Sequence, residues 1–197
     1  MQKMEDPKES QRRGFFRRAM GLLALLSGAY PPLVTGRVAL AKQANAEGCS
    51  VATPPAMTGP FFTPRSPRRN ALIERGTTGD RMTLTGRVLG ADCKPIAGAL
   101  LDFWQADGLG NYDNKGYRLR GHQFADEDGT YTLETVIPGE YPGRTPHLHV
   151  RVRGGSGPVL TTQLYFPGHP KNGPDFLFDE RLVMKGGASK FYFDFVL

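Results

Sequence analysis

The sequence has few cysteines, few histidines and no sign of a helical domain. Its 197 residues include two cysteines, four histidines and one tryptophan. An apolar run from Ala19 to Tyr30 is well short of the about 20 residues that a membrane-spanning helix needs. No segment repeats, no block is of low complexity, and no long helical period follows this run, which argues against a repeat array or a helical bundle.

The first residues follow the pattern of an exported protein. Residues 12–17 read Arg-Arg-Gly-Phe-Phe-Arg, the twin-arginine export pattern, and the apolar run comes next. Small-residue cleavage sites follow at 39–41 and 44–46. We therefore predict a twin-arginine signal peptide over residues 1–46 and a periplasmic or extracellular protein without a membrane anchor after its removal. A basic amphipathic anchor that stays attached is the alternative.

The basic charge of the chain belongs to this leader. Residues 1–46 hold eight basic and three acidic side chains, which is a net +5 of the chain's +6. The remainder therefore carries a net +1, and the basic isoelectric point does not describe it. Nucleic-acid binding loses its main support, so we predict no nucleic-acid partner.

Cys49 and Cys93 are the only cysteines. A pair of cysteines in an exported chain predicts a Cys49–Cys93 disulfide. Two buried free thiols are the alternative.

Short strand signals fill the rest of the chain. Residues 47–80 are rich in proline and predict an extended arm whose Phe61 and Phe62 dock on the body. Residues 81–197 alternate as strands, punctuated by glycine, proline and aspartate, near 82–89, 99–105, 131–136, 147–153, 159–166 and 191–196. We predict an all-β domain, an antiparallel β-sandwich with long irregular loops, whose core includes Phe103 and Trp104.

The segment His147-Leu148-His149 places two imidazoles on one face of a strand, because side chains alternate between the faces. Two neighbouring imidazoles on a rigid strand suit a metal ion. A half-polar surface strand whose histidines face water explains the same motif, and an H-x-H pattern alone does not decide between the two.

Two separate blocks resemble the intradiol ring-cleavage dioxygenases, the family of catechol and protocatechuate 3,4-dioxygenases. The first block runs from Leu84 to Tyr112 and includes Leu-Asp-Phe-Trp-Gln-Ala-Asp at 101–107; Cys93 stands where the signature usually has glycine. The second block is Pro-Gly-Glu-Tyr-Pro at 138–142, followed by Arg144 and the two histidines. The resemblance covers roughly residues 59–166, most of the chain that follows the predicted leader.

The resemblance implies a mononuclear non-haem Fe(III) bound by two tyrosinates and two histidines. The residues that it assigns as ligands are Tyr112, Tyr141, His147 and His149, with Tyr141 and His149 axial. It assigns Arg144 to stabilising negative charge on the substrate, Tyr141 to accepting a substrate proton, and Gln163 to supporting the site. It implies a catechol and O2 as substrates and a cis,cis-muconate-type product, and it leaves a homo-oligomer open.

The chemistry of the residues agrees with that ligand set. Phenolate is a hard anionic donor suited to Fe(III), and a tyrosine with a reference pKa near 10 needs a strong Lewis acid to stay ionised at neutral pH. His122 and His169 match no ligand position, and Tyr117 and Tyr131 are assigned structural roles. The loop between Tyr141 and His147 is shorter than in the protocatechuate enzymes, so substrate specificity stays open.

Two other functions fit parts of the sequence. The segments Gly-Arg-Val, Asp-Gly-Thr-Tyr and Pro-Gly-Glu-Tyr also occur in transthyretin-like and carboxypeptidase-regulatory β-sandwich modules, which bind partners and catalyse nothing. A zinc or copper site that uses His147 and His149 with other ligands is the second alternative. The metal content and the visible spectrum distinguish these alternatives from the iron enzyme.

Overall fold

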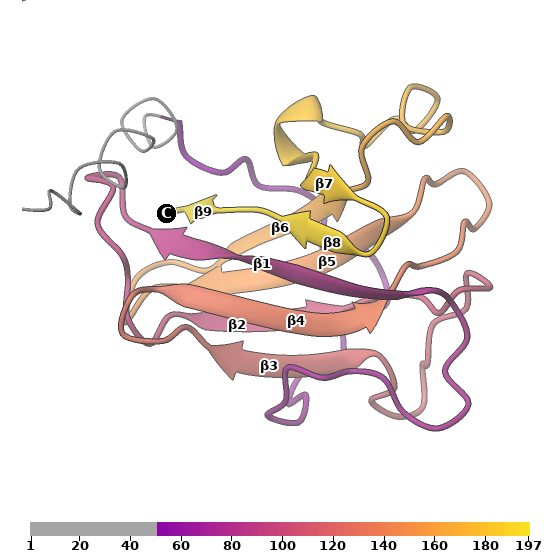
Figure 1. Ribbon diagram of the computed structural model, residues 1–197, viewed down its shortest axis with the longest axis horizontal. Coiled ribbons are helices and arrows are strands. Elements are labelled where there is room, and N and C mark those ends of the chain that lie inside the picture. Colours follow the sequence, from indigo (N-terminus) through magenta and orange to yellow (C-terminus); the bar gives the residue numbers. More distant parts are fainter. Residues whose placement is uncertain (1–50) are drawn as a thin grey trace, which may run out of the picture. The chain divides into compact units, whose positions relative to one another are not determined.

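The computed structural model describes residues 51–197 (Figure 1). The predicted leader, residues 1–46, and Cys49 lie outside this description, so the signal peptide and the disulfide stay predictions. Cys93 is exposed in the turn after the first strand. None of the described helices is long and apolar enough to span a membrane.

The described residues form nine strands and one short 3₁₀ helix. In chain order these are β1 (Arg81–Leu89), β2 (Leu100–Trp104), β3 (Arg120–Phe124), β4 (Thr130–Val136), β5 (His147–Arg153), β6 (Leu160–Tyr165), η1 (Glu180–Leu182), β7 (Lys185–Gly187), β8 (Lys190–Tyr192) and β9 (Phe195–Val196). The all-β fold that the sequence predicts is confirmed.

The strands belong to two sheets (Figure 1). The first has the order β4-β1-β8-β7, with β9 beside β1, and the second has the order β3-β2-β5-β6. All pairs of the second sheet are antiparallel, as predicted. The first sheet differs, because β8 and β9 run parallel to β1. The antiparallel β7–β8 hairpin reverses the chain and brings its last residues alongside β1 in the same direction.

Two strands and one interruption were not predicted. Strand β3 reads Arg-Gly-His-Gln-Phe and β7 reads Lys-Gly-Gly, and neither has the apolar alternation that marks a strand in sequence. The predicted strand over 191–196 divides into β8 and β9. Between them the Asp194 carboxylate, rather than a backbone carbonyl, accepts the Arg87 N–H at 2.6 Å.

One apolar cluster contains buried side chains from both sheets. It includes Leu84 and Val88 of β1, Leu101 and Phe103 of β2, Leu133 of β4, Val150 and Val152 of β5, and Leu164 of β6. On β5 the core side chains are Leu148, Val150 and Val152, so His147 and His149 lie on the opposite, outer face of the second sheet. Both histidines are nevertheless buried.

The first part of the arm, residues 51–69, runs along that outer face, and residues 70–73 continue beside β4 of the first sheet, where the Leu72 N–H donates to the Glu134 carbonyl. The first part pairs along β6, where the Ala56 N–H donates to the Thr161 carbonyl, and it reaches β3, where the Arg69 N–H donates to the His122 carbonyl. Between these points Phe62 packs edge-on against Trp104, with ring centroids 4.9 Å apart. The predicted docking of the arm is confirmed.

Gly86 of β1 allows the end of the chain to approach the first sheet closely. A Cβ at this position would lie 1.8 Å from the Phe193 carbonyl oxygen, which also accepts the hydroxyl hydrogen of buried Tyr131 at 2.8 Å. Only glycine leaves room for this backbone contact.

We therefore expect Gly86→Ala to lower the free energy of unfolding by about 1–3 kcal/mol or more, since overpacking of a buried position costs at least that much. Urea unfolding monitored by circular dichroism measures the change. Gly173→Ala is the matched control, because a Cβ there meets no atom within 4 Å. Equal losses in the two variants would contradict this account of Gly86.

Candidate metal centre

His147 and His149 converge on one point of the outer face. Their Nε2 atoms are 3.1 Å apart, and the side chains are only 2% and 1% exposed. The His147 Nδ1 atom is 2.7 Å from the Thr145 carbonyl oxygen. A carbonyl can only accept a hydrogen bond, so Nδ1 carries the proton and Nε2 presents its lone pair. That is the tautomer that a metal ligand needs.

Both imidazoles are neutral at neutral pH. Burial, reinforced by the positive charge of Arg144, lowers the pKa of His147 to about 4. Burial also lowers the pKa of His149 well below its usual value, and the neighbouring His147 adds to the effect. Neutral imidazole is the metal-binding form of histidine.

Trp104 supports His149 from the side. The two rings stack with centroids 4.8 Å apart and an angle of 8° between their planes. The sequence predicts Trp104 in the core, and the side chain is buried, but on the outer face of the sheet rather than in the cluster between the sheets. Leu101 and Phe103 of β2 point into the core, so alternation directs Trp104 the other way, beneath Phe62.

Tyr112 and Tyr141 come from two loops that lie against each other. The Gly139 N–H donates to the Asp107 carbonyl at 2.8 Å. Gly110 has a φ of +83°, and a Cβ there would lie 2.2 Å from the Glu140 carbonyl oxygen. The loop that carries Tyr112 therefore needs glycine to reach the loop that carries Tyr141.

The four predicted ligands close a ring around one point. Ring centroids are 5.9 Å apart for Tyr112 and Tyr141, 5.7 Å for Tyr141 and His147, 4.7 Å for His147 and His149, and 6.2 Å for His149 and Tyr112. Residues from two loops and one strand thus bring two phenol rings and two imidazole rings together.

The Tyr112 hydroxyl is the donor with the most unusual surroundings. It is buried and has no hydrogen-bond partner among the described residues. Phe61 of the arm stacks on its ring at 4.3 Å. Burial, with the nearby Tyr141 second, raises the pKa of the Tyr112 phenol. A buried hydroxyl without a partner is costly, and a cation bound to its oxygen would remove that cost.

Arg144 and Gln163 lie beside Tyr141. The Arg144 Nη1 atom is 3.3 Å from the Tyr141 hydroxyl, and Nη2 donates to the Gln163 Oε1 atom. Gln163 pairs with His149 across β5 and β6, and its Nε2 donates to the Met57 carbonyl at 2.7 Å. All six residues singled out by the sequence therefore occupy one region.

Within residues 51–197, no group of three or more histidine, cysteine, aspartate or glutamate side chains is arranged to hold a metal ion. The side chains with donor oxygens beside the histidine pair are Tyr112 and Tyr141. His122 and His169 lie elsewhere: His122 Nδ1 contacts the Ser66 carbonyl at 2.8 Å, and His169 Nε2 is 3.5 Å from a Glu140 carboxylate oxygen.

Tyr117 and Tyr131 have the structural roles expected of them. The Tyr117 hydroxyl donates to the Pro64 carbonyl at 3.0 Å at the surface, and Tyr131 is part of the core.

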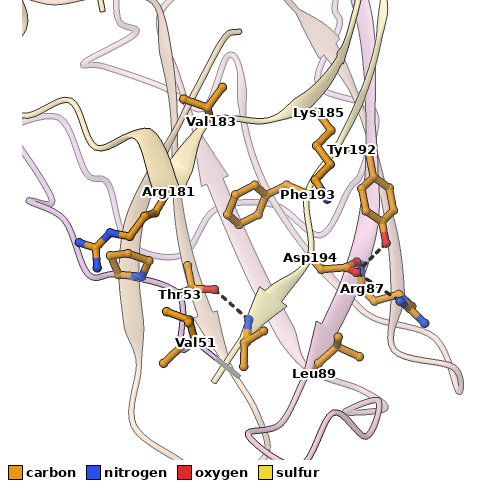
Figure 2. Close-up of a pocket in the computed structure, with 13 residues that line it drawn as sticks. Val51, Thr53, Arg87, Leu89, Arg181, Val183, Lys185, Tyr192, Phe193 and Asp194 are labelled. Carbon is orange, nitrogen blue, oxygen red and sulfur yellow. Dashed lines mark hydrogen bonds and ion pairs between the residues drawn. The ribbon is translucent and has the colours of Figure 1, made fainter. Parts of the chain in front are cut away.

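A cavity of about 460 Å³ opens beside this cluster. Its lining includes Tyr141, Arg144, Glu140 and Lys171, but not Tyr112. A second cavity of about 460 Å³ contains none of the six site residues (Figure 2). There Asp194 accepts hydrogen bonds from both Arg87, at 3.3 Å, and Tyr192, at 2.6 Å, so these three side chains are paired with one another. Because only the cavity beside Tyr141 is lined by site residues, it is the candidate binding pocket.

Sequence reasoning missed two residues that hold the site together. Asp175 forms an ion pair with Arg144. The buried Arg120 donates hydrogen bonds to the Phe61 carbonyl, at 2.6 Å, and to the Asp113 carbonyl, at 2.9 Å. Phe61 and Asp113 are both neighbours of Tyr112, so Arg120 ties together the segments around it. Asp175 lies in an irregular loop and Arg120 begins a strand without apolar alternation. No local pattern marks either residue, although an arginine at a position this buried requires several acceptors.

Known proteins resemble this chain over most of the described residues. A family model described as a dioxygenase matches residues 57–185. The chain is 30% identical over 187 residues to the 6-chlorohydroxyquinol 1,2-dioxygenase of Cupriavidus pinatubonensis, a match that covers 79% of this chain and 67% of that protein. It is 32% identical over 162 residues to the protocatechuate 3,4-dioxygenase beta chain of Burkholderia cepacia, which covers 66% and 69% of the two chains.

A solved structure agrees with these relatives. The dioxygenase domain of a dioxygenase–carbohydrate-binding protein fusion from Streptomyces sp. SirexAA-E superposes with a TM-score of 0.71 and 51% identity. The match covers 75% of this chain and 98% of that chain.

The depressed histidine pKa values predict how stability depends on pH. In the metal-free protein, the unfolded chain binds a proton at His147 near pH 6.5, whereas the folded chain binds it only near pH 4. The free energy of unfolding should therefore fall as the pH is lowered between these values. Urea unfolding of chelator-treated protein at several pH values measures this slope. The slope should be shallower in His147→Gln, and an unchanged slope would contradict the assignment.

Proposed function

This chain belongs to the intradiol ring-cleavage dioxygenases, which are oxidoreductases that act on catechol-type rings, and we propose that it cleaves such a ring at an Fe(III) site. The bond cleaved joins the two hydroxylated carbons, both atoms of O2 enter the product, and a catechol gives a cis,cis-muconate. The observation that carries the proposal is the closed ring of Tyr112, Tyr141, His147 and His149.

The donor set fits a ferric ion. Two phenol oxygens are hard donors that become anionic, and the two Nε2 atoms are neutral donors held 3.1 Å apart by one strand. The partnerless Tyr112 hydroxyl would gain a partner, and its raised pKa means that only a strong Lewis acid ionises it at neutral pH. A ferric ion bound here would supply the Lewis acidity that ionises the phenols and activates the aromatic ring toward O2.

Tyr141 is the phenol that a substrate reaches. It lines the cavity, whereas Tyr112 lies beneath Phe61 with its hydroxyl buried. We assign the Tyr141 phenol oxygen to accepting the proton of a catechol hydroxyl. Tyr112 then remains in place and maintains the site.

Arg144 is positioned for charge stabilisation. Its guanidinium lines the same cavity, lies 3.3 Å from the Tyr141 oxygen, and is held by Gln163. A fixed cation in a partly buried site stabilises the negative charge that develops on the ring and its oxygens. Gln163 acts by holding this guanidinium in place.

Family membership decides between this function and the non-catalytic β-sandwich module that the sequence leaves open. Export by the twin-arginine route, a periplasmic or extracellular location and a homo-oligomer remain proposals. The first two rest on residues 12–46, outside the structure described above.

Oxygen uptake by the iron-loaded protein tests the reaction. We expect one O2 consumed per catechol, a dicarboxylate product and a visible charge-transfer band from tyrosinate to iron. Tyr141→Phe should lower kcat by about 10²–10⁴-fold, the usual contribution of a general base, and alter the band. Tyr117→Phe, which removes an exposed hydroxyl that contacts Pro64, is the control. Unchanged turnover in Tyr141→Phe would contradict the role of Tyr141, and zinc or copper in an active, colourless protein would contradict the ferric site.

The charges that line the cavity predict a preference among catechols. Lys171 pairs with Glu140, and Arg144 pairs with Asp175, so no cation is left free in the lining. We expect kcat/KM for catechol to exceed that for 3,4-dihydroxybenzoate by about tenfold, which is about 1.4 kcal/mol.

Two substitutions should move this ratio in opposite directions. Glu140→Gln frees the Lys171 ammonium and should favour the carboxylated substrate, whereas Lys171→Ala leaves Glu140 unpaired and should disfavour it. Steady-state kinetics with both substrates measure the ratio. A shift of the same sign in both variants would show that charge in this cavity does not set the preference.

A further inference from the structure

The loop from Pro167 to Asp179 places a carboxylate directly beneath Arg144. The Asp175 side chain is 1% exposed and forms an ion pair with the Arg144 Nε atom, at 2.9 Å from Oδ2 and 3.1 Å from Oδ1. The same carboxylate accepts the N–H groups of Thr145 and Leu177, each at 2.9 Å. Three donor groups thus hold the carboxylate, which has little freedom to move.

This ion pair determines the direction of the whole guanidinium. A guanidinium is planar and rigid, so fixing its Nε edge also fixes where its two Nη atoms point. Here Nη1 points at the Tyr141 hydroxyl, 3.3 Å away, and Nη2 points at Gln163. Each nitrogen therefore has a partner, and Asp175 is the only charged one.

Asp175 also connects to the histidine pair. Its Oδ2 atom accepts the Thr145 N–H, and the Thr145 carbonyl accepts the His147 Nδ1 hydrogen at 2.7 Å. A single carboxylate therefore holds both the arginine and the backbone residue that sets the His147 tautomer.

Both partners of the pair are ionised. Burial opposes charge on Arg144, but the hydrogen bond to Asp175 and the electrostatic attraction of Tyr141, Asp175 and Tyr165 together outweigh it, and the pKa of Arg144 is raised. Burial also opposes charge on Asp175, but the N–H groups of Leu177 and Thr145 and the arginine together lower its pKa. The loop does not need this charge as an anchor, because Asn172 ties it to the Phe166 carbonyl and to the Thr145 hydroxyl, each at 2.8 Å.

We propose that Asp175 is a positioning residue for ring cleavage, one that acts through Arg144 by aiming its guanidinium at Tyr141 and the cavity. The proposal rests on the function proposed above. It differs from a purely structural role for Asp175, because it requires the effect of Asp175 to pass through Arg144.

The first arm of the test needs no metal and no turnover. In ¹H–¹⁵N spectra of the metal-free protein, the Arg144 Nε–H signal should be protected from solvent exchange and should be assignable by its loss in Arg144→Ala. Asp175→Asn should abolish this protection. Asp179→Asn, the same change four residues along the loop at a carboxylate that pairs with Arg181, should leave it unchanged. Full protection in Asp175→Asn would overturn the proposal.

The second arm is a double-mutant cycle in the iron-loaded enzyme. Asp175→Asn should lower kcat about 10–100-fold, with a smaller change in KM and with iron content retained. In an Arg144→Ala background the same substitution should cause no further loss, since residues that act as a unit are not additive. Additive losses, or parallel loss of iron and activity, would overturn the proposal in favour of a structural role.

A further variant covers the case in which Asp175→Asn does not fold. Arg144→Lys keeps the positive charge but lacks the planar guanidinium that Asp175 orients. If the direction of the guanidinium matters, the turnover of Arg144→Lys should be about as low as that of Arg144→Ala. Near-normal turnover in Arg144→Lys would overturn the proposal. If the wild-type protein cleaves no catechol at all, the proposed function fails, and the exchange measurement still decides whether Asp175 orients Arg144.

Discussion

The alternation of side chains along β5 places its apolar residues in the core and its two histidines on the outer face. Leu148, Val150 and Val152 bury one face of this strand in the core, and this burial fixes the register of the strand against β2 and β6. A shift of one residue would turn His147 and His149 into the core. The same apolar contacts that stabilise the fold therefore set the position of the imidazole pair, and strand pairing places Trp104 on one side of His149 and Gln163 on the other.

A strand can hold the histidines, but the phenols must come from elsewhere. Tyr112 and Tyr141 lie on loops that meet through glycine, where the Gly110 backbone approaches the Glu140 carbonyl too closely for a side chain. The arm then covers the site, with Phe61 stacked on Tyr112. The result is an outer sheet face whose histidines are buried and neutral, with a cavity on the side of Tyr141 and Arg144.

The residues of this site could be assigned from the sequence because most of them lie in two motifs that resemble a known family. His147 and His149 share a strand, Arg144 and Tyr141 precede them within one short segment, and the motif around Tyr112 is continuous. What the sequence could not predict depends on contacts between distant segments. Asp175 is an ordinary loop aspartate until the fold places it under Arg144. The predicted burial of Trp104 is confirmed, but the arm that covers its side of the sheet is not visible in its own strand, and β3 carries no apolar alternation at all.

The account depends on four side chains binding one ferric ion. Anomalous diffraction at the iron edge, from crystals of iron-loaded protein, tests this most directly. We expect a single strong iron peak within bonding distance of the hydroxyl oxygens of Tyr112 and Tyr141 and of the Nε2 atoms of His147 and His149. A peak elsewhere, or one bonded to the histidines while the Tyr112 oxygen lies beyond bonding distance, would contradict it.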